Sequence, residues 1–414
     1  MRIDLTTVAA GGDAIGRDGD GRVVFVDGGL PDETVEADVV EEKPDFARAV
    51  VRIVERPSPW RVEAPCPMVA AGCGGCGWQH VEPGAQARLK RDVVLDALKR
   101  IAHLPDAPVA DGVPAVGPAA YRTTLRLAVD PATGRAGHRR RQSHDVVPTD
   151  PAVGCLVAHP LLDELVRLGA YRGVDEVTLR VSAATGERLA VLHGARGEDA
   201  YAMGADLPED VAVVDGSTHG ARAQRKARQA AITEEVLGRR YRVSPTSFFQ
   251  SGPEAAALLA ATVRAAAGDA ELLLDAYCGV GLLAGAVAGP DTQVVGVESH
   301  AAAASDARHN LQAFGIDAEI VGGEVARLPA PRNGEDGPDV VIADPARPGL
   351  GKGAAAALGR LAAPRLVLVS CDPASLARDA NLLRSHGYGL SSVQVLDLFP
   401  HTPHVEAVSV FDLG

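Results

Sequence analysis

From about residue 240 onward, the chain alternates between short apolar runs and longer Ala-rich stretches. Pro253 suits the first turn of a helix, and Gly315 and Gly387 suit positions just after helix ends. Apolar strands that alternate with helices indicate a parallel sheet covered on both faces. We therefore predict a doubly wound, Rossmann-like α/β domain over residues 239–414. Its expected strands are L-L-L-D-A (272–276), Q-V-V-G-V-E (293–298), D-V-V-I-A-D (339–344) and R-L-V-L-V-S (365–370).

The first 56 residues have a different pattern, in which short runs at 22–27, 34–41 and 47–54 are separated by Gly and Asp turns. About five short strands in so short a segment are typical of a small β-barrel of the oligonucleotide-binding (OB) kind. The segment R-P-S-P-W (56–60) then interrupts the pattern as a linker. We predict an OB-like barrel over residues 1–56.

Between these parts, residues 57–238 mix both kinds of pattern. A helix is expected at 86–101, and strands are expected around 123–129, 176–181 and 189–193. This pattern indicates an α+β central domain and leaves its topology open.

Composition and length agree with this division. A chain of 414 residues is too long for one ordinary core, and 46% hydrophobic with 23% charged residues is typical of a globular protein. No run of eighteen apolar residues occurs, and the first residues, M-R-I-D-L-T-T-V, lack the core of a signal peptide. We expect a cytoplasmic, monomeric protein that has no contact with a membrane.

The net charge of −13 weighs against nucleic-acid binding, but the distribution of the basic residues weighs for it. Such runs are most often solvated surface, yet several of them on an acidic chain favour a local basic face. They are Arg135, Arg139, Arg140 and Arg141 with His138 and His144; Arg222, Arg225, Lys226 and Arg228; and Arg239, Arg240 and Arg242.

A Gly-rich turn follows the first predicted strand of the α/β domain, as D-A-Y-C-G-V-G-L (275–282), and Glu298 ends the next strand. Such a turn lets backbone approach a ligand, and a carboxylate at that place can bind both ribose hydroxyls of an adenine nucleoside. A dinucleotide and S-adenosylmethionine are the two alternatives. The turn lacks the third glycine of the dinucleotide spacing, which favours the methyl donor.

Three more segments end strands at the ligand-binding edge of the predicted sheet: D-P-A-R (344–347), S-C-D-P (370–373) and F-P-H-T-P-H-V-E (399–406). Cys371 precedes an expected helix, a position that lowers the pKa of a thiol. A thiolate that adds to carbon 6 of uracil makes carbon 5 nucleophilic towards a sulfonium methyl group. Glu406 is our candidate for the base that then removes the proton from carbon 5. A buried packing role for Cys371 and an exposed strand-end role for Glu406 are the alternatives.

Together with S-F-F-Q (247–250), these segments resemble the class I RNA uridine-5-methyltransferases, in particular the iron–sulfur branch that modifies 23S ribosomal RNA. The segments F-V-D-G-G-L-P-D-E-T-V (25–35) and D-F-A-R-A-V-V (45–51) resemble that family's RNA-binding TRAM barrel. The resemblance implies that Cys371 is the nucleophile and Glu406 the base. It implies that the cofactor is contacted by Gln250, Tyr277, Glu298 and Asp344. A transfer-RNA enzyme and a non-catalytic RNA-binding factor are the rival interpretations.

A cysteine cluster precedes the helix at 86–101, in C-P-M-V-A-A-G-C-G-G-C-G-W-Q-H (66–80). With the isolated Cys155, the set Cys66, Cys73 and Cys76 could bind either zinc or a [4Fe–4S] cluster. Three close ligands and one distant one differ from the two close pairs usual for zinc. Both this spacing and the family resemblance favour the iron–sulfur cluster.

The chain departs from the family pattern at three positions. Gly252 and Asp372 stand where asparagine is common, and Leu282 stands where a polar cofactor contact is common. A carboxylate beside Cys371 would disfavour its thiolate unless that carboxylate is hydrogen-bonded or paired. The barrel carries seven Lys or Arg against thirteen Asp or Glu, so we expect RNA affinity to rest on the basic runs at 135–141 and 222–228.

Overall fold

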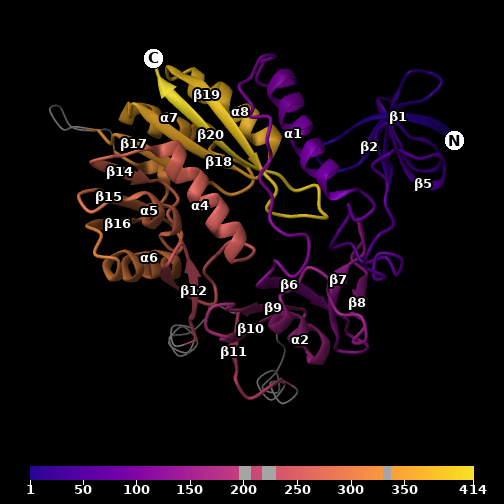
Figure 1. The fold of residues 1–414 in the computed structure, drawn as a ribbon, viewed down its shortest axis with the longest axis horizontal. Helices are drawn as coiled ribbons and strands as arrows, with labels where there is room; N and C mark the ends of the chain where they lie inside the picture. The colour runs from indigo at the N-terminus through magenta and orange to yellow at the C-terminus, as the bar shows by residue number, and fades with distance from the viewer. Residues whose placement is uncertain (195–206, 217–229, 330–336) are drawn as a thin grey trace.

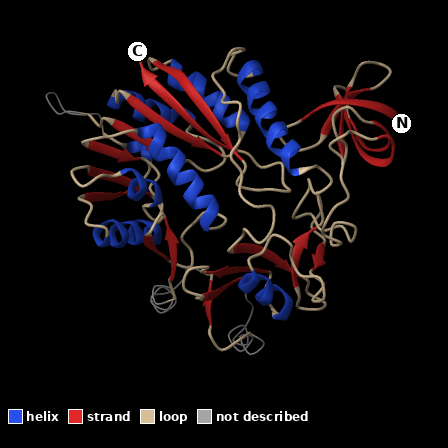
Figure 2. Cartoon of the chain, in the orientation of Figure 1, coloured by secondary structure: helices blue, strands red, loops and turns tan. Residues whose placement is uncertain are grey.

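The computed structural model describes residues 1–194, 207–216, 230–329 and 337–414. The chain passes from an N-terminal barrel through a central sheet to a large C-terminal sheet flanked by helices (Figures 1 and 2). The predicted basic run at 222–228 lies outside the described residues. In the part of the chain that is described, no helix has the length and apolar character needed to cross a membrane.

The N-terminal segment forms a closed five-stranded barrel in the order β1-β2-β3-β5-β4, as the turn-rich pattern predicts. Alternate residues of each strand point inwards, and Ile3, Leu5, Val24 and Val35 are among those that fill the interior. The strands are β1 (Arg2–Val8), β2 (Ala14–Arg17), β3 (Val23–Asp27), β4 (Thr34–Glu42) and β5 (Phe46–Arg56).

The central part is a six-stranded sheet in the order β11-β10-β9-β6-β7-β8, with α2 (Pro160–Leu168) packed on it. The predicted α+β character is confirmed, and β10 and β11 form its one parallel pair among the described strands. The strands are β6 (Thr124–Val129), β7 (Ala136–Arg139), β8 (Val146–Pro148), β9 (Glu176–Val181), β10 (Arg188–His193) and β11 (Val211–Asp215).

The C-terminal sheet has seven strands in the order β16-β15-β14-β17-β18-β20-β19, and only β20 runs against the others. Its inner strands are mainly apolar because helices cover both faces. The doubly wound prediction is confirmed. The strands are β14 (Leu272–Asp275), β15 (Gln293–Glu298), β16 (Ala318–Gly322), β17 (Val340–Ala343), β18 (Arg365–Ser370), β19 (Tyr388–Leu396) and β20 (Glu406–Leu413).

Two separate cores lie on the two faces of this sheet. One contains α4 (Pro253–Ala267), α5 (Leu282–Val287) and α6 (Ala301–Ala313), and the other contains α7 (Gly351–Leu361), α8 (Pro373–Arg384) and α1 (Pro83–Arg100). Helix α1 belongs by sequence to the predicted central domain, yet it packs against α8 and β19. The hairpin of β12 (Ile232–Val236) and β13 (Arg239–Val243) likewise spans the predicted boundary at 238/239. The predicted boundaries of the central and C-terminal domains therefore remain predictions.

Candidate active site

Four predicted site residues meet at one edge of the C-terminal sheet. Glu298 ends β15, Asp344 follows β17 and Cys371 follows β18, all at the carboxyl ends of parallel strands. Glu406 begins β20, which runs antiparallel beside β18. The last residue of β18 pairs with the second residue of β20, so Cys371 and Glu406 are neighbours across the two strands.

A pocket of about 240 Å³ opens beside the ends of β14 and β15. Tyr277 and Glu298 contribute polar groups to its lining, and Leu350 is part of its apolar wall. The carboxylate of Glu298 accepts hydrogen bonds from the backbone N–H groups of Gly279, at 3.0 Å, and His300, at 2.6 Å. These bonds fix the carboxylate at the pocket wall, a geometry that suits two ribose hydroxyls.

The other two predicted cofactor contacts do not line this pocket. Gln250 is buried, and Asp344 lies on the Cys371 side of the sheet edge. Next to Gln250, the side chain of Phe248 is 72% exposed while that of Phe249 is buried. Phe248 was not predicted as a site residue, because nothing in a Phe-Phe pair tells which ring faces solvent.

Asp275, at the start of the Gly-rich turn, is a second residue without a predicted role. Its carboxylate is fully buried, and one oxygen accepts a 3.0 Å hydrogen bond from the backbone N–H of Ala284. The other oxygen has no hydrogen-bond partner among the described residues. Burial raises the pKa of Asp275 to about 7. Its neighbour in the chain, Ala276, lines the pocket, whereas Asp275 itself does not.

The electrostatics around Cys371 contradict one expectation. Burial, followed by the carboxylates of Glu406 and Asp344, raises the pKa of the Cys371 thiol to about 11, although Arg347 acts in the opposite direction. The predicted lowering of this pKa is therefore wrong for the protein without bound RNA. The position at the start of α8 is as predicted, but burial and two nearby acids outweigh its effect.

The two carboxyl groups also perturb each other. Burial raises the pKa of Asp344 to about 7. Burial, with the added charge of Asp344, raises the pKa of Glu406 well above its ordinary value. Two carboxyl groups in one buried site resist double ionisation, so a proton is retained on the pair near neutral pH.

The structure accounts for each departure from the family pattern. The Asp372 side chain caps α8 by accepting a 2.8 Å hydrogen bond from the N–H of Ser375, and it lies 3.7 Å from the Arg347 guanidinium. Gly252 is needed because a Cβ at that position would collide with the carbonyl of Tyr121. Leu282 is buried in the apolar core between the sheet and its helices, where a polar side chain would not fit the surroundings.

The four predicted metal ligands come from two segments that approach each other. Burial raises the pKa of Cys73 and Cys76, and the thiol of Cys66 adds to both effects. Burial raises the pKa of Cys155 to about 12, with smaller contributions from Cys76 and Cys73. The thiols are thus neighbours, yet no three His, Cys, Asp or Glu side chains of the described chain have the spacing of a metal site.

The segment 397–406, which leads to Glu406, is held by groups that the sequence analysis missed. The backbone N–H of Trp78 donates to the His401 carbonyl at 2.8 Å, and the His401 N–H donates to the Gln86 side chain at 2.6 Å. Tyr121 donates from its hydroxyl to the Pro400 carbonyl at 3.1 Å. These contacts join residues over 270 positions apart, so no local pattern could have indicated them.

Comparisons with known proteins agree with this architecture. A TRAM domain model matches residues 1–51. An uncharacterized RNA methyltransferase from Streptomyces avermitilis is 39% identical over 99% of this chain and 97% of its own length. Another from Gloeobacter violaceus is 35% identical over 100% of this chain and 96% of its own. The crystal structure of the Pyrococcus abyssi tRNA (uracil-54, C5)-methyltransferase with S-adenosyl-L-homocysteine matches 99% of this chain and all of that one, with a TM-score of 0.74 and 23% identity.

The fold and the pocket at the sheet edge define a methyltransferase with a Rossmann-like domain and an N-terminal TRAM barrel. The relatives narrow this class further. The chain belongs to the family of TRAM-containing RNA methyltransferases. The predictions of an RNA-methylating enzyme and of its fold are confirmed.

Proposed function

We propose that the protein transfers a methyl group from S-adenosylmethionine to carbon 5 of a uridine in RNA. The observation that carries the proposal is the grouping of Cys371, Glu406 and Asp344 at the same sheet edge as the Glu298 pocket. A thiol beside two acids suits covalent activation of a pyrimidine. The Pyrococcus abyssi enzyme of the same fold is named for this kind of reaction.

In the proposed reaction, the Cys371 thiol loses its proton to solvent as its sulfur forms a bond to carbon 6, and the electrons of the 5,6 double bond move towards oxygen 4. Carbon 5 then attacks the methyl group, and S-adenosylhomocysteine leaves. The carboxylate of Glu406 takes the proton from carbon 5. The electrons of that C–H bond re-form the double bond as the bond between sulfur and carbon 6 breaks.

The residues around these atoms have separate tasks. Glu298 and Tyr277, which line the pocket, would hold the methyl donor there. Gln250 and Asp344, the other two residues that the resemblance implies, lie outside this lining and would contact the donor beyond it. The raised pKa of Glu406 suits a base that must work near neutral pH, because a stronger base takes a proton from carbon more readily. The exposed ring of Phe248 offers a surface on which an unstacked base can lie.

The substrate must be a uridine that can leave its stack, as in a loop or a single-stranded region. We propose ribosomal RNA, specifically 23S, because the chain combines the TRAM barrel with a cysteine cluster. Transfer RNA is the second candidate, favoured by the substrate named for the Pyrococcus abyssi enzyme.

Four cysteine thiols are the donor set of a [4Fe–4S] cluster. Cys66, Cys73, Cys76 and Cys155 lie close enough for neighbouring thiols to affect one another's pKa, although their spacing in this structure is not that of a metal site. We propose that they hold this cluster. Its contribution would be structural: it would tie the loop 66–80 to the segment around Cys155, and no step of the methyl transfer passes through it.

Incubation with labelled methyl donor and undermodified RNA tests the reaction. Nucleoside analysis should place the label on carbon 5 of uridine, and 23S RNA should be labelled faster than transfer RNA in matched reactions. The variant Cys371→Ala should lose transfer while it still binds the methyl donor by calorimetry. Label on cytidine or on a base nitrogen, or full activity without the thiol, would contradict the mechanism.

A further inference from the structure

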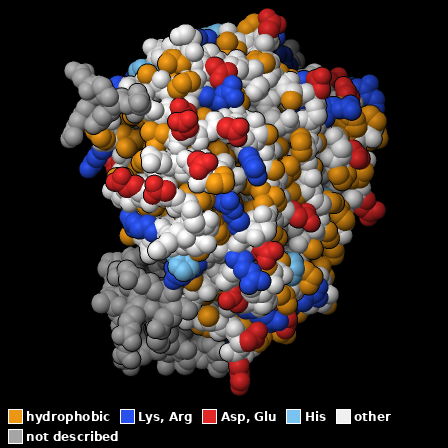
Figure 3. Space-filling model, turned by 60° about the vertical axis from the view of Figure 1, so that its left-hand side comes forward, with side chains coloured by type: hydrophobic (Ala, Val, Ile, Leu, Met, Phe, Trp, Pro, Cys, Tyr) orange, Lys and Arg blue, Asp and Glu red, His pale blue; other side chains and the backbone are white. Residues whose placement is uncertain are grey.

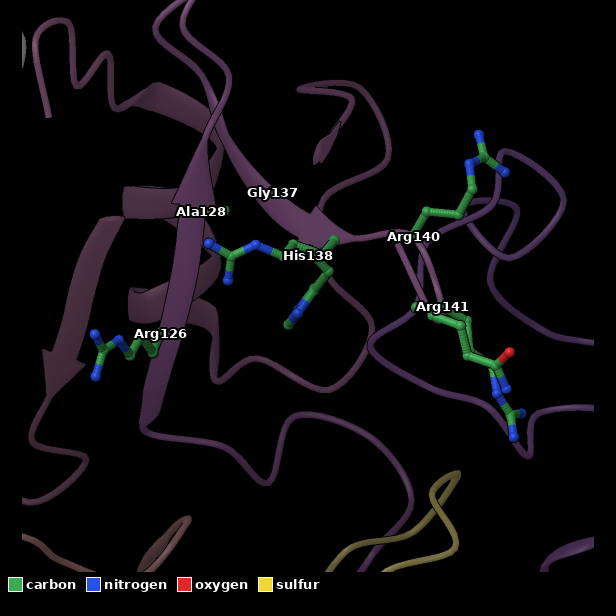
Figure 4. Close-up of a pocket in the computed structure, with 9 residues that line it drawn as sticks. Arg126, Ala128, Gly137, His138, Arg140 and Arg141 are labelled. Atoms are coloured by element: carbon green, nitrogen blue, oxygen red, sulfur yellow. The ribbon is translucent and has the colours of Figure 1, made fainter. Parts of the chain in front are cut away.

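A second pocket, of about 370 Å³, lies on the central sheet (Figure 4). Strands β6 and β7 supply most of its lining, and Gly74 of the cysteine loop (residues 66–80) completes it. Its lining contains four arginines and His138 but no carboxylate residue. The arginines are Arg126, Arg139, Arg140 and Arg141.

The ion pairs around this pocket leave part of its positive charge uncompensated. Arg126 and Arg139 share one partner, Glu176, at 2.5 Å and 2.8 Å. Arg140 is exposed, and among the described residues it makes no ion pair, only a 3.4 Å hydrogen bond to the carbonyl of Ala71. These three guanidinium groups therefore face a single carboxylate.

The cysteine loop and the barrel hold these arginines in place. The N–H of Gly74 donates to the Arg139 carbonyl at 3.1 Å, and Cys73 forms an isolated bridge with Arg140. Gly72 packs so closely on the guanidinium of Arg140 that a Cβ would collide with it. Arg141 reaches the barrel through Asp13, at 2.6 Å, and Asp27, at 2.8 Å. The basic groups are therefore positioned before any ligand arrives.

We propose that this pocket binds the sugar–phosphate backbone of the substrate RNA close to the target uridine, an inference that rests on the proposed function. Figure 4 shows Arg140 and Arg141 pointing in different directions from the end of β7, with Arg126 across on β6. Guanidinium groups that spread apart suit an extended polyanion better than one compact anion. Arg140, which makes no ion pair among the described residues, can bind a phosphate through two hydrogen bonds.

The pocket is also placed correctly for such a strand. Gly74 lines it, and Trp78, four residues later in the same loop, binds the His401 carbonyl in the segment that leads to Glu406. Four residues span at most about 14 Å, so one loop joins the pocket to a contact with the segment that leads to the candidate base. On the face in Figure 3, by contrast, acidic and basic side chains are interspersed. A compact basic pocket explains how a chain of net charge −13 binds RNA.

Binding of a stem–loop RNA with uridines in its loop, measured without methyl donor over a range of salt concentrations, tests the proposal. Arg140→Ala should weaken binding by about two- to five-fold at 0.15 M salt. It should also lower the slope of log K against log salt by roughly 0.7 to 0.9. Arg140→Lys should keep the slope, since the charge remains. Arg126→Gln is the second variant, and it should act in the same direction.

Arg360→Ala is the matched control, because Arg360 is also exposed and also donates one 3.4 Å hydrogen bond to a carbonyl, that of Leu328. If Arg140→Ala and Arg126→Gln bind RNA with the same affinity and salt slope as this control, the proposal is overturned. Arg140→Ala should raise the KM for RNA, whereas Arg360→Ala should leave the rate of methyl transfer and the KM at their wild-type values. Failure of the wild-type protein to methylate uridine would reject the proposed function, while the affinity measurement would still decide on the pocket.

Discussion

The buried ion pair between Lys90 and Asp397 provides a quantitative test of how α1 holds the segment that carries the candidate base. The Lys90 ammonium lies 2.5 Å from the Asp397 carboxylate and 3.0 Å from the Phe399 carbonyl, and the two charged side chains are 0% and 3% exposed. Burial lowers the pKa of Lys90, and Asp397 opposes that effect. Lys90→Met would remove the charge and keep a side chain of similar length.

This substitution leaves Asp397 buried with the Phe399 N–H as a remaining donor, at 3.2 Å. Removal of one partner from a buried pair costs about 3–5 kcal/mol. We therefore expect the free energy of unfolding to fall by about 4 kcal/mol at pH 8.

Urea unfolding at pH 8, followed by the fluorescence of the buried Trp78, measures the loss. Lys99→Met, at an exposed position of the same helix, is the control and should stay close to wild type. The double variant Lys90→Met with Asp397→Leu removes both charges and should recover most of the stability. The reasoning is refuted if the loss is under about 1 kcal/mol, or if the double variant is no more stable than the single one.

Three further outcomes follow from the site. Glu406→Gln should accumulate a covalent protein–RNA adduct, because the proton on carbon 5 cannot leave. The adduct should be visible on denaturing gels. If the variant releases product at the wild-type rate, Glu406 is not the base. Wild-type kcat/KM should fall by up to about tenfold per pH unit as pH drops below about 7. Asp344, whose pKa is raised to about 7, then takes up a proton, and the Asp344–Glu406 pair keeps no carboxylate to act as the base. A flat profile from pH 5 to 8 would contradict this. Anaerobically purified protein should absorb broadly in the visible range and lose this absorption in Cys76→Ala; a colourless protein with one zinc per chain would favour the other metal.

Much of the fold could be predicted because local patterns of apolar and turn residues indicate its strands. The apolar run 339–344 contains β17 (Val340–Ala343), and the turn-rich first 56 residues contain the whole barrel. The helix expected at 86–101 begins earlier, at Pro83, because Glu82 caps it with a 2.8 Å hydrogen bond to the Ala85 N–H. Its packing against α8 could not be read from the sequence, since that contact joins segments almost 300 residues apart.

The candidate site was predictable to the extent that strand ends mark it. Glu298 and Cys371 were located by that rule, and the sheet topology then brings Glu406 beside Cys371. The pKa of Cys371 was predicted in the wrong direction, because local sequence shows the helix that follows but not the buried carboxyl groups opposite it. Asp275 was missed as a site residue because its unpartnered oxygen is a property of packing.

The segment 397–406 links the candidate base, Glu406, to the loop that lines the basic pocket. Lys90 and Gln86 bind it from α1, and Trp78 binds it from the cysteine loop. The same loop forms one wall of the basic pocket through Gly74. The groups around Glu406 have pKa values shifted against ionisation, which costs stability, so the contacts that fix this segment must offset that cost. A change that loosens the cysteine loop should therefore affect both RNA binding and proton removal. The reason is that this one loop lines the proposed RNA-binding pocket and also binds the segment that leads to Glu406.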